Sequence, residues 1–160
     1  MEHSVLKAKA WLVFLILLAS YFISWFVKDD EANEMLKLVG FSIFCIWLAL
    51  IGNIMNQLDE TQEKPGIGWF IINIVLTMSG PIASKLLADP NFVVTPSSFN
   101  AKGVWVVPVL YFVVAYVQIH WFTASSIVAK EQGKKPEFSQ VLGTAILLSL
   151  WPIGVWFIQP

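Results

Sequence analysis

The charged side chains of this chain gather in a few short segments, and long uncharged apolar runs separate them. An acidic cluster falls at 29–34, a mixed cluster at 59–64 and a lysine-rich cluster at 130–137. A helix needs about 20 apolar residues to cross the hydrocarbon core of a bilayer, and the runs between the clusters approach that length. The pattern predicts an all-α, polytopic membrane helix bundle that forms a single transmembrane domain, residues 1–160.

Composition agrees with this prediction, since 57% of the residues are hydrophobic and only 13% are charged. A typical soluble domain is about 25% charged. We expect five transmembrane helices, at residues 8–27, 38–55, 67–87, 103–129 and 138–158. A secretory signal peptide is the alternative for the first run. That run is long for a signal peptide, and it carries Tyr21, Trp25 and Phe26 in place of a small-residue cleavage site.

The lysines suggest an orientation. Five crossings place the two chain ends on opposite sides of the membrane. With the N-terminus inside, the inner segments hold six lysines: Lys7, Lys9, Lys64, Lys130, Lys134 and Lys135. The outer segments then hold four: Lys28, Lys37, Lys85 and Lys102. Because cytoplasmic loops carry an excess of basic residues, we expect a cytoplasmic N-terminus, in a bacterial inner membrane.

Small and polar residues mark the expected contacts between helices. Lipid tails give helices no hydrophobic reason to associate, so close packing and interhelical hydrogen bonds hold them together. One helix-packing face in the second span recurs at steps of three and four residues: Ser42, Cys45, Ala49, Gly52 and Asn56. In the third span, Asn73 and Thr77 begin a similar stripe. Pro81 and Pro152 are candidate kinks in the third and fifth spans.

The fourth span carries polar side chains on two sides. At about 100° per residue, Tyr116, His120 and Thr123 share one face of a helix. A second set, seven residues apart, lies on nearly the opposite face: Tyr111, Gln118 and Ser125. A helix that faces lipid on one side does not place hydrogen-bonding groups on both. We therefore expect this helix to be central, flanked by other helices or by a second copy of the protein.

The segment 88–103 is the one long connection between the runs. Its prolines, serines and asparagines predict an ordered loop outside the membrane. A short piece that dips back into the membrane is the alternative.

Several functional classes lack the residues that they need. His120 is the only histidine besides His3, and Cys45 is the only cysteine, so no metal site and no other cofactor is predicted. We expect a neutral His120 ring that is hydrogen-bonded to a neighbouring helix, with a proton-binding switch or a ligand contact as the alternative. No Asp or Glu lies within the five runs, which disfavours proton-coupled pumping.

Enzyme and nucleic-acid functions are not predicted either. The chain has no HExxH or GxSxG motif, no phosphate-binding glycine loop and no paired carboxylates. An intramembrane serine–histidine pair is the alternative, but no residue is evident that orients such a base. A net charge of −1 leaves no basic face for nucleic acid.

Three functions remain, in order of preference. The first is helix-mediated assembly in the lipid bilayer, as a homo-oligomer or as a subunit of a membrane complex. The second is an uncoupled channel or facilitative transporter for a neutral solute or an ion, because uncharged polar walls suit such species. Its path residues are Asn73, Thr77, Tyr116, Gln118, His120 and Thr123. The third is a sensor that binds a hydrophobic ligand among the aromatic side chains.

Overall fold

A computed structural model describes residues 10–58, 67–96 and 98–150 of the chain. Its elements are α2 (Ala10–Ser24), α3 (Asp30–Leu58), α4 (Ile67–Leu87), β1 (Phe92–Val94), β2 (Phe99–Ala101), the 3-10 turn η1 (Gly103–Trp105), α5 (Val106–Gln132) and α6 (Phe138–Ser149). Five α-helices therefore make up most of the described chain, and the predicted all-α class is confirmed.

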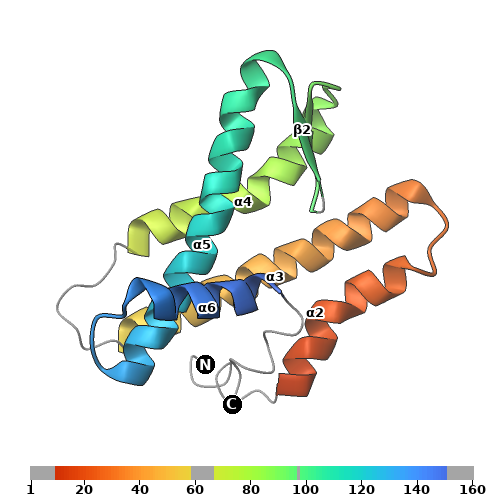
Figure 1. Ribbon diagram of the computed structural model, residues 1–160. Helices are drawn as coiled ribbons and strands as arrows, with labels where there is room; N and C mark the ends of the chain where they lie inside the picture. The colour runs from red at the N-terminus through yellow and green to blue at the C-terminus, as the bar shows by residue number, and fades with distance from the viewer. Residues whose placement is uncertain (1–9, 59–66, 97, 151–160) are drawn as a thin grey trace.

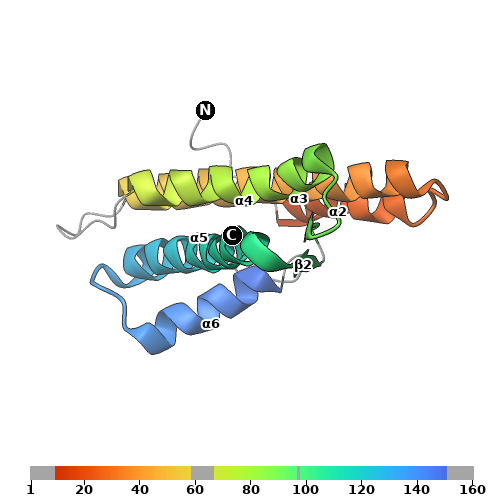
Figure 2. The ribbon, with the colours of Figure 1, turned by 90° about the horizontal axis from the view of Figure 1, so that it is seen from above.

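The helices form two layers (Figures 1 and 2). α3 and α4 lie in one layer with α2 beside α3, and α5 and α6 lie in the other. α5 packs against α3, α4 and α6, as expected of a central helix. α3 packs against α2, α4 and α5, so it shares the central position with α5. The core between the layers is apolar, with Phe44, Leu48 and Ile119 almost fully buried.

The observed helices match the expected spans to different degrees. α4 covers 67–87, as predicted. α3 begins at Asp30 rather than at 38, because Asp29 caps its first turn by accepting a hydrogen bond from the Ala32 N–H at 2.8 Å. α2 covers less than the predicted 8–27, and residues 1–9 lie outside the described chain. α6 ends at Ser149, and the rest of its predicted span lies largely in 151–160, outside the described residues.

Three helices are long and apolar enough to cross a bilayer: α3, α4 and α5 with its preceding turn. At 1.5 Å per residue, the helices α3, α4 and α5 alone are about 43, 32 and 40 Å long, against a hydrocarbon core of about 30 Å. α2 and α6 are apolar but shorter, with 15 and 12 residues. Complete crossings by the first and fifth runs therefore stay a prediction.

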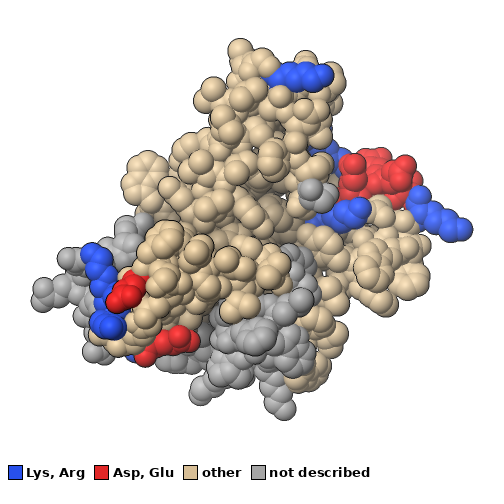
Figure 3. Space-filling view, viewed as in Figure 1, with Lys and Arg blue, Asp and Glu red and all other residues tan. Residues whose placement is uncertain are grey.

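The charged side chains of the described residues lie towards two ends of the bundle, and Figure 3 shows an uncharged surface between them on one face. At one end, the last turn of α5 and the connection to α6 carry Lys130, Glu131, Lys134, Lys135 and Glu137. At the other end lie the start of α3, the end of α4 and the connection to α5, with the remaining charged residues of the described chain. We call this second end the hairpin end. The uncharged surface between the two ends is the band expected to face acyl chains.

The connection 88–103 contains a β-hairpin, which the sequence analysis did not predict. β1 and β2 pair antiparallel, with Phe92 opposite Ala101 and Val94 opposite Phe99. Ser84 of α4 fixes the hairpin twice: its hydroxyl donates to the Phe92 carbonyl at 3.0 Å and accepts from the Val94 N–H at 2.9 Å. α4 therefore supplies hydrogen bonds that hold the inner strand of the hairpin in place.

Asp89 anchors the base of the hairpin. Its carboxylate accepts hydrogen bonds from the Asn91 N–H and from the Trp105 indole N–H, each at 2.8 Å. The Trp105 ring stacks on Phe92 with centroids 4.7 Å apart. The backbone bond from Asn91, followed by the bond from Trp105, lowers the pKa of the Asp89 carboxyl below its ordinary value. The ionised carboxylate therefore stabilises the anchored hairpin.

We predict that the anchor weakens in acid and in the variant Asp89→Asn. A lowered native pKa means that the stabilisation is present above the ordinary aspartate value of about 3.9 and is lost as pH falls through the native pKa. Asp89→Asn should remove this pH dependence and weaken the anchor at neutral pH. Hydrogen exchange at the Phe92 and Lys102 amides measures both effects. The control Asp30→Asn, at the start of α3, should leave these amides protected. An equal loss of amide protection in both variants would contradict the role of Asp89 as the anchor of the hairpin.

Candidate functional site

The proposed path residues do not form one lined passage. Asn73, Thr77 and Thr123 are buried, at 0–3% exposure, where α4, α5 and α3 meet. The Asn73 amide donates to the Gln118 side-chain oxygen at 2.5 Å and so links α4 to α5. The Thr123 hydroxyl donates to the Ile119 carbonyl of its own helix at 2.9 Å. The Asn73 amide and the Thr123 hydroxyl are thus bonded within the bundle, as in a helix contact, whereas the Thr77 hydroxyl has no hydrogen-bond partner among the described residues.

His120 points into the bundle and is 3% exposed. Its Nδ1 lies 2.8 Å from the Tyr116 carbonyl oxygen, and because a carbonyl only accepts, Nδ1 carries the proton. The ring lies against Phe44 and Tyr116, with centroids 5.7 and 4.5 Å away. Its Nε2 is buried and has no hydrogen-bond partner among the described residues. The bond to its own helix replaces the expected bond to a neighbouring helix.

Other buried polar atoms also lack partners in the described part of the chain, and they are spread over four helices. They include Ser20 Oγ on α2, Trp47 Nε1 and Asn56 Oδ1 on α3, Thr77 Oγ1 on α4 and Ser126 Oγ on α5. The described residues contain no group of three or more His, Cys, Asp and Glu side chains that could hold a metal ion. The buried polar atoms without partners are thus distributed over several helices of the described chain.

The small-residue face of α3 lies against other helices of the same chain. Cys45, Gly52 and Asn56 are buried, and Ser42 and Ala49 are half-buried. An added Cβ at Gly52 would lie 2.5 Å from Phe70 Cζ and 3.2 Å from Thr123 Oγ1. Gly52 therefore permits the close approach of α3 to α4 and α5. Most of this face is therefore used for contacts within one chain.

Of the two prolines that are candidate helix kinks, Pro81 lies within the described residues. α4 continues through Pro81, whose buried ring forms part of a cleft wall. Pro152 lies outside the described residues.

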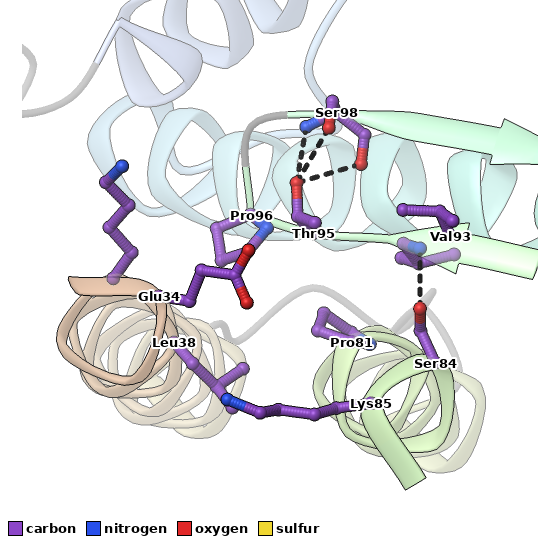
Figure 4. Close-up of a pocket in the computed structure, with 11 residues that line it drawn as sticks. Glu34, Leu38, Pro81, Ser84, Lys85, Val93, Thr95, Pro96 and Ser98 are labelled. Carbon is purple, nitrogen blue, oxygen red and sulfur yellow. Dashed lines mark hydrogen bonds between the residues drawn. The ribbon is translucent and has the colours of Figure 1, made fainter. Parts of the chain in front are cut away.

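A cleft of about 290 Å³ opens at the hairpin end between α3, α4 and the hairpin (Figure 4). We call it the charged cleft, because Glu34, Lys37 and Lys85 line it. Lys85 extends across it from α4 towards Leu38 of α3, and Glu34 extends towards the hairpin loop (Figure 4). The three charged side chains form no ion pair with any described residue. They are therefore available to a ligand.

A second cleft, of about 160 Å³, lies between α3, α5 and the same hairpin loop. We call it the aromatic cleft. Its walls are apolar apart from the loop: Phe41, Phe99, Phe112, Val113 and Tyr116, with Thr95, Pro96 and Ser98. Phe41 and Tyr116 stack with centroids 6.4 Å apart. Of the six proposed path residues, Tyr116 lines this cleft, and the other five line neither cleft.

Neither of these two clefts is predicted by the sequence. Their walls come from three helices and a hairpin that lie far apart along the chain, and Glu34, Lys37 and Lys85 were interpreted only as interfacial charges. One feature of the sequence does indicate the α3 wall of the two clefts. Glu34, Lys37, Leu38 and Phe41 follow steps of three and four residues, which place two charges and an aromatic ring on one face of α3.

Comparison with protein-family models, with curated proteins and with solved structures finds no match to this chain. Its function is therefore inferred from the geometry of its own residues.

We predict that Gly52→Ala destabilises the bundle. The new methyl group would meet the buried Phe70 ring, which cannot move freely because it stacks on Phe122 at 4.2 Å. Overpacking of this kind costs about 1–3 kcal/mol in the free energy of unfolding. The control is Gly143→Ala in α6, where an added Cβ meets nothing within 4 Å. It should be neutral or stabilise by up to about 1 kcal/mol. Thermal unfolding in detergent compares the two, and equal midpoints would contradict the tight contact.

Proposed function

We propose that the protein is a non-enzymatic integral membrane protein that works by self-association, and that two copies meet through the outer face of α5. The observation that carries this proposal is Gln118, a polar side chain in the middle of α5 that is exposed on the uncharged band. The alternative, in which another membrane subunit occupies the same face, differs only in the identity of the partner.

α5 has one covered face and one open face. Ala115, Ile119 and Thr123 are at 0% exposure within the bundle. The open face presents large apolar side chains and two polar ones: Val107, Leu110, Tyr111, Val114, Val117 and Gln118. Their spacing of three, four and seven residues forms a continuous stripe along the helix. Such a stripe fits the helix of a second copy.

Gln118 supplies the polar part of this contact. Its side-chain oxygen accepts the bond from Asn73, while its amide N–H groups have no hydrogen-bond partner among the described residues. An amide N–H that faces acyl chains loses the hydrogen bonds that water would supply. A glutamine side chain both donates and accepts, so two copies of Gln118 can bond to each other across a twofold axis. In the proposed dimer, self-association thus removes the unfavourable exposure of the Gln118 amide N–H groups to acyl chains.

The channel alternative has less support. Four of its six path residues are buried in helix contacts, and the hydrogen bonds of Asn73 and Thr123 are made within the bundle. The Asn73 bond links α4 to α5, and the Thr123 bond stays within α5. A conducting path would require these contacts to open, and nothing in the described residues favours that.

We predict that Gln118→Leu weakens self-association about 3- to 20-fold, the range expected for one interhelical hydrogen bond in a membrane. The dissociation constant in detergent micelles or liposomes, from energy transfer between labelled copies of the full chain, measures the effect. Because Gln118→Leu also leaves Asn73 without its partner, Asn73→Leu is the matched control and should associate at least as well as wild type. Ser79→Leu, on the exposed side of α4, should have no effect. A strictly monomeric wild type in native membranes would contradict the proposal.

We also propose that the N-terminus is cytoplasmic in a bacterial inner membrane and that the hairpin end faces the periplasm. The six-to-four lysine asymmetry supports this orientation. The α5–α6 connection, with Lys130, Lys134 and Lys135, then lies on the cytoplasmic side.

Cysteine labelling in intact cells should reveal this orientation. The native Cys45 is 0% exposed and should stay unlabelled. A membrane-impermeant maleimide should modify Ser98→Cys, in the hairpin loop, before the inner membrane is disrupted. It should modify Lys134→Cys only afterwards, because that residue lies at the opposite end of α5. The reverse order of labelling would invert the orientation.

A further inference from the structure

We propose that the charged cleft and the aromatic cleft together form a binding site for a zwitterionic phospholipid, one whose head group carries a phosphate and an ammonium group. The head group occupies the charged cleft, and part of one acyl chain occupies the aromatic cleft. This site is separate from the open face of α5, so it does not depend on self-association.

The charges of the first cleft are complementary to such a head group. Lys37 and Lys85 provide two ammonium groups for a phosphate, and Glu34 provides a carboxylate for an ammonium group. All three side chains lack ion-pair partners in the described chain, so binding replaces no existing contact. Ammonium groups bind phosphate as strong, charge-assisted donors. An unpaired carboxylate beside two lysines favours a ligand that carries both signs of charge.

The second cleft continues the first on the other side of the hairpin loop. Thr95, Pro96 and Ser98 line both clefts. Along α3, Glu34 and Lys37 line the charged cleft, and Phe41, one turn further on, lines the aromatic cleft. A ligand that is charged at one end and apolar at the other therefore matches the two adjoining clefts, one lined by charged residues and the other by aromatic residues.

The position of the clefts identifies a lipid as the source of the ligand. Both clefts are lined by the hairpin loop, so they lie at the hairpin end, next to the charged residues at the start of α3 and the end of α4 (Figure 4 shows the charged cleft). Phospholipid head groups occupy that level in a membrane, and their tails lie beside the uncharged band. A soluble phosphate ester has no apolar part for the walls formed by Phe112, Val113 and Tyr116.

The walls of the site are held in place before a ligand binds. Ser84, which lines the charged cleft, makes the two hydrogen bonds that fix β1 to α4. The hairpin loop is closed by bonds between Thr95 and Ser98, including the Thr95 N–H to the Ser98 carbonyl at 2.8 Å. A preformed site avoids the entropy cost of ordering its walls on binding.

The test is native mass spectrometry of the full chain in mild detergent with three added lipids: phosphatidylethanolamine, phosphatidylglycerol and diacylglycerol. Phosphatidylethanolamine should be retained most strongly. Diacylglycerol, which lacks the head group, should be retained least. Free phosphoethanolamine should not compete at equal concentration, because it lacks the tail. Equal retention of all three lipids, or effective competition by the free head group, would overturn the proposal.

Charge variants test the head-group contacts. Lys37→Gln and Lys85→Gln should each lower phosphatidylethanolamine retention about fivefold, the effect expected for one lysine near a membrane surface. The control Lys102→Gln removes a lysine at the same end that does not line the cleft, and it should have little effect. Glu34→Gln should shift the preference towards phosphatidylglycerol, whereas Glu31→Gln, one turn earlier on α3, should not. Equal effects of cleft variants and controls would overturn the site.

A pair of neighbouring positions on α5 tests the tail contact. Val113→Trp places a bulky ring in the aromatic cleft and should reduce lipid retention severalfold. Val114→Trp places the same ring on the open face of α5 and should not reduce it. Thermal unfolding of both variants identifies any that fail to fold, and in that case Phe99→Ala, on the exposed strand β2, replaces Val113→Trp. Gln118→Leu should retain the lipid like wild type, which separates this site from self-association.

Discussion

The hydrogen bond between Asn73 and Gln118 joins the two layers of the bundle away from the ends of α4 and α5. α4 belongs to one layer and α5 to the other, and most contacts between the layers are apolar. Between hydrocarbon tails, apolar contacts alone favour no particular arrangement of helices, because lipid is as apolar as leucine. Polar pairs and close-packed small residues therefore select the arrangement. Gly52 is such a close-packed small residue, because its lack of a side chain allows α3 to approach Phe70 and Thr123.

The same bond connects the interior of the bundle to its surface. Asn73 is 3% exposed, whereas Gln118 lies on the open face of α5. Gln118 therefore has its oxygen engaged inside the chain while its N–H groups stay accessible from outside. A partner that bonds to Gln118 acts on a residue that already fixes α5 against α4. In the proposed dimer, one side chain takes part both in association and in the packing of the two layers, which is why the control variant at Asn73 is informative.

The sequence predicted those features that depend on residues close together in the chain. The bounds of α4 and the inward position of His120 follow from helical periodicity and from the cost of burying polar groups in oil. The early start of α3 was missed, because the polar turns from Asp30 onwards resemble a loop in composition and become helical through the Asp29 cap. The hairpin was missed as well, because its strands have three residues each and depend on Ser84, which belongs to another element.

The two clefts depend on that hairpin, and this is why periodicity alone could not reveal them. The loop after β1 folds between α3 and α5 and separates a charged wall from an aromatic one. Without the bonds from Ser84 and the anchor at Asp89, the loop would have no fixed place between the helices. Charged residues at the end of a transmembrane helix ordinarily extend into water or towards head groups in general. At this end of the bundle, the hairpin gathers Glu34, Lys37 and Lys85 around an open cleft of about 290 Å³, and this grouping is the basis for the proposed discrimination between head groups.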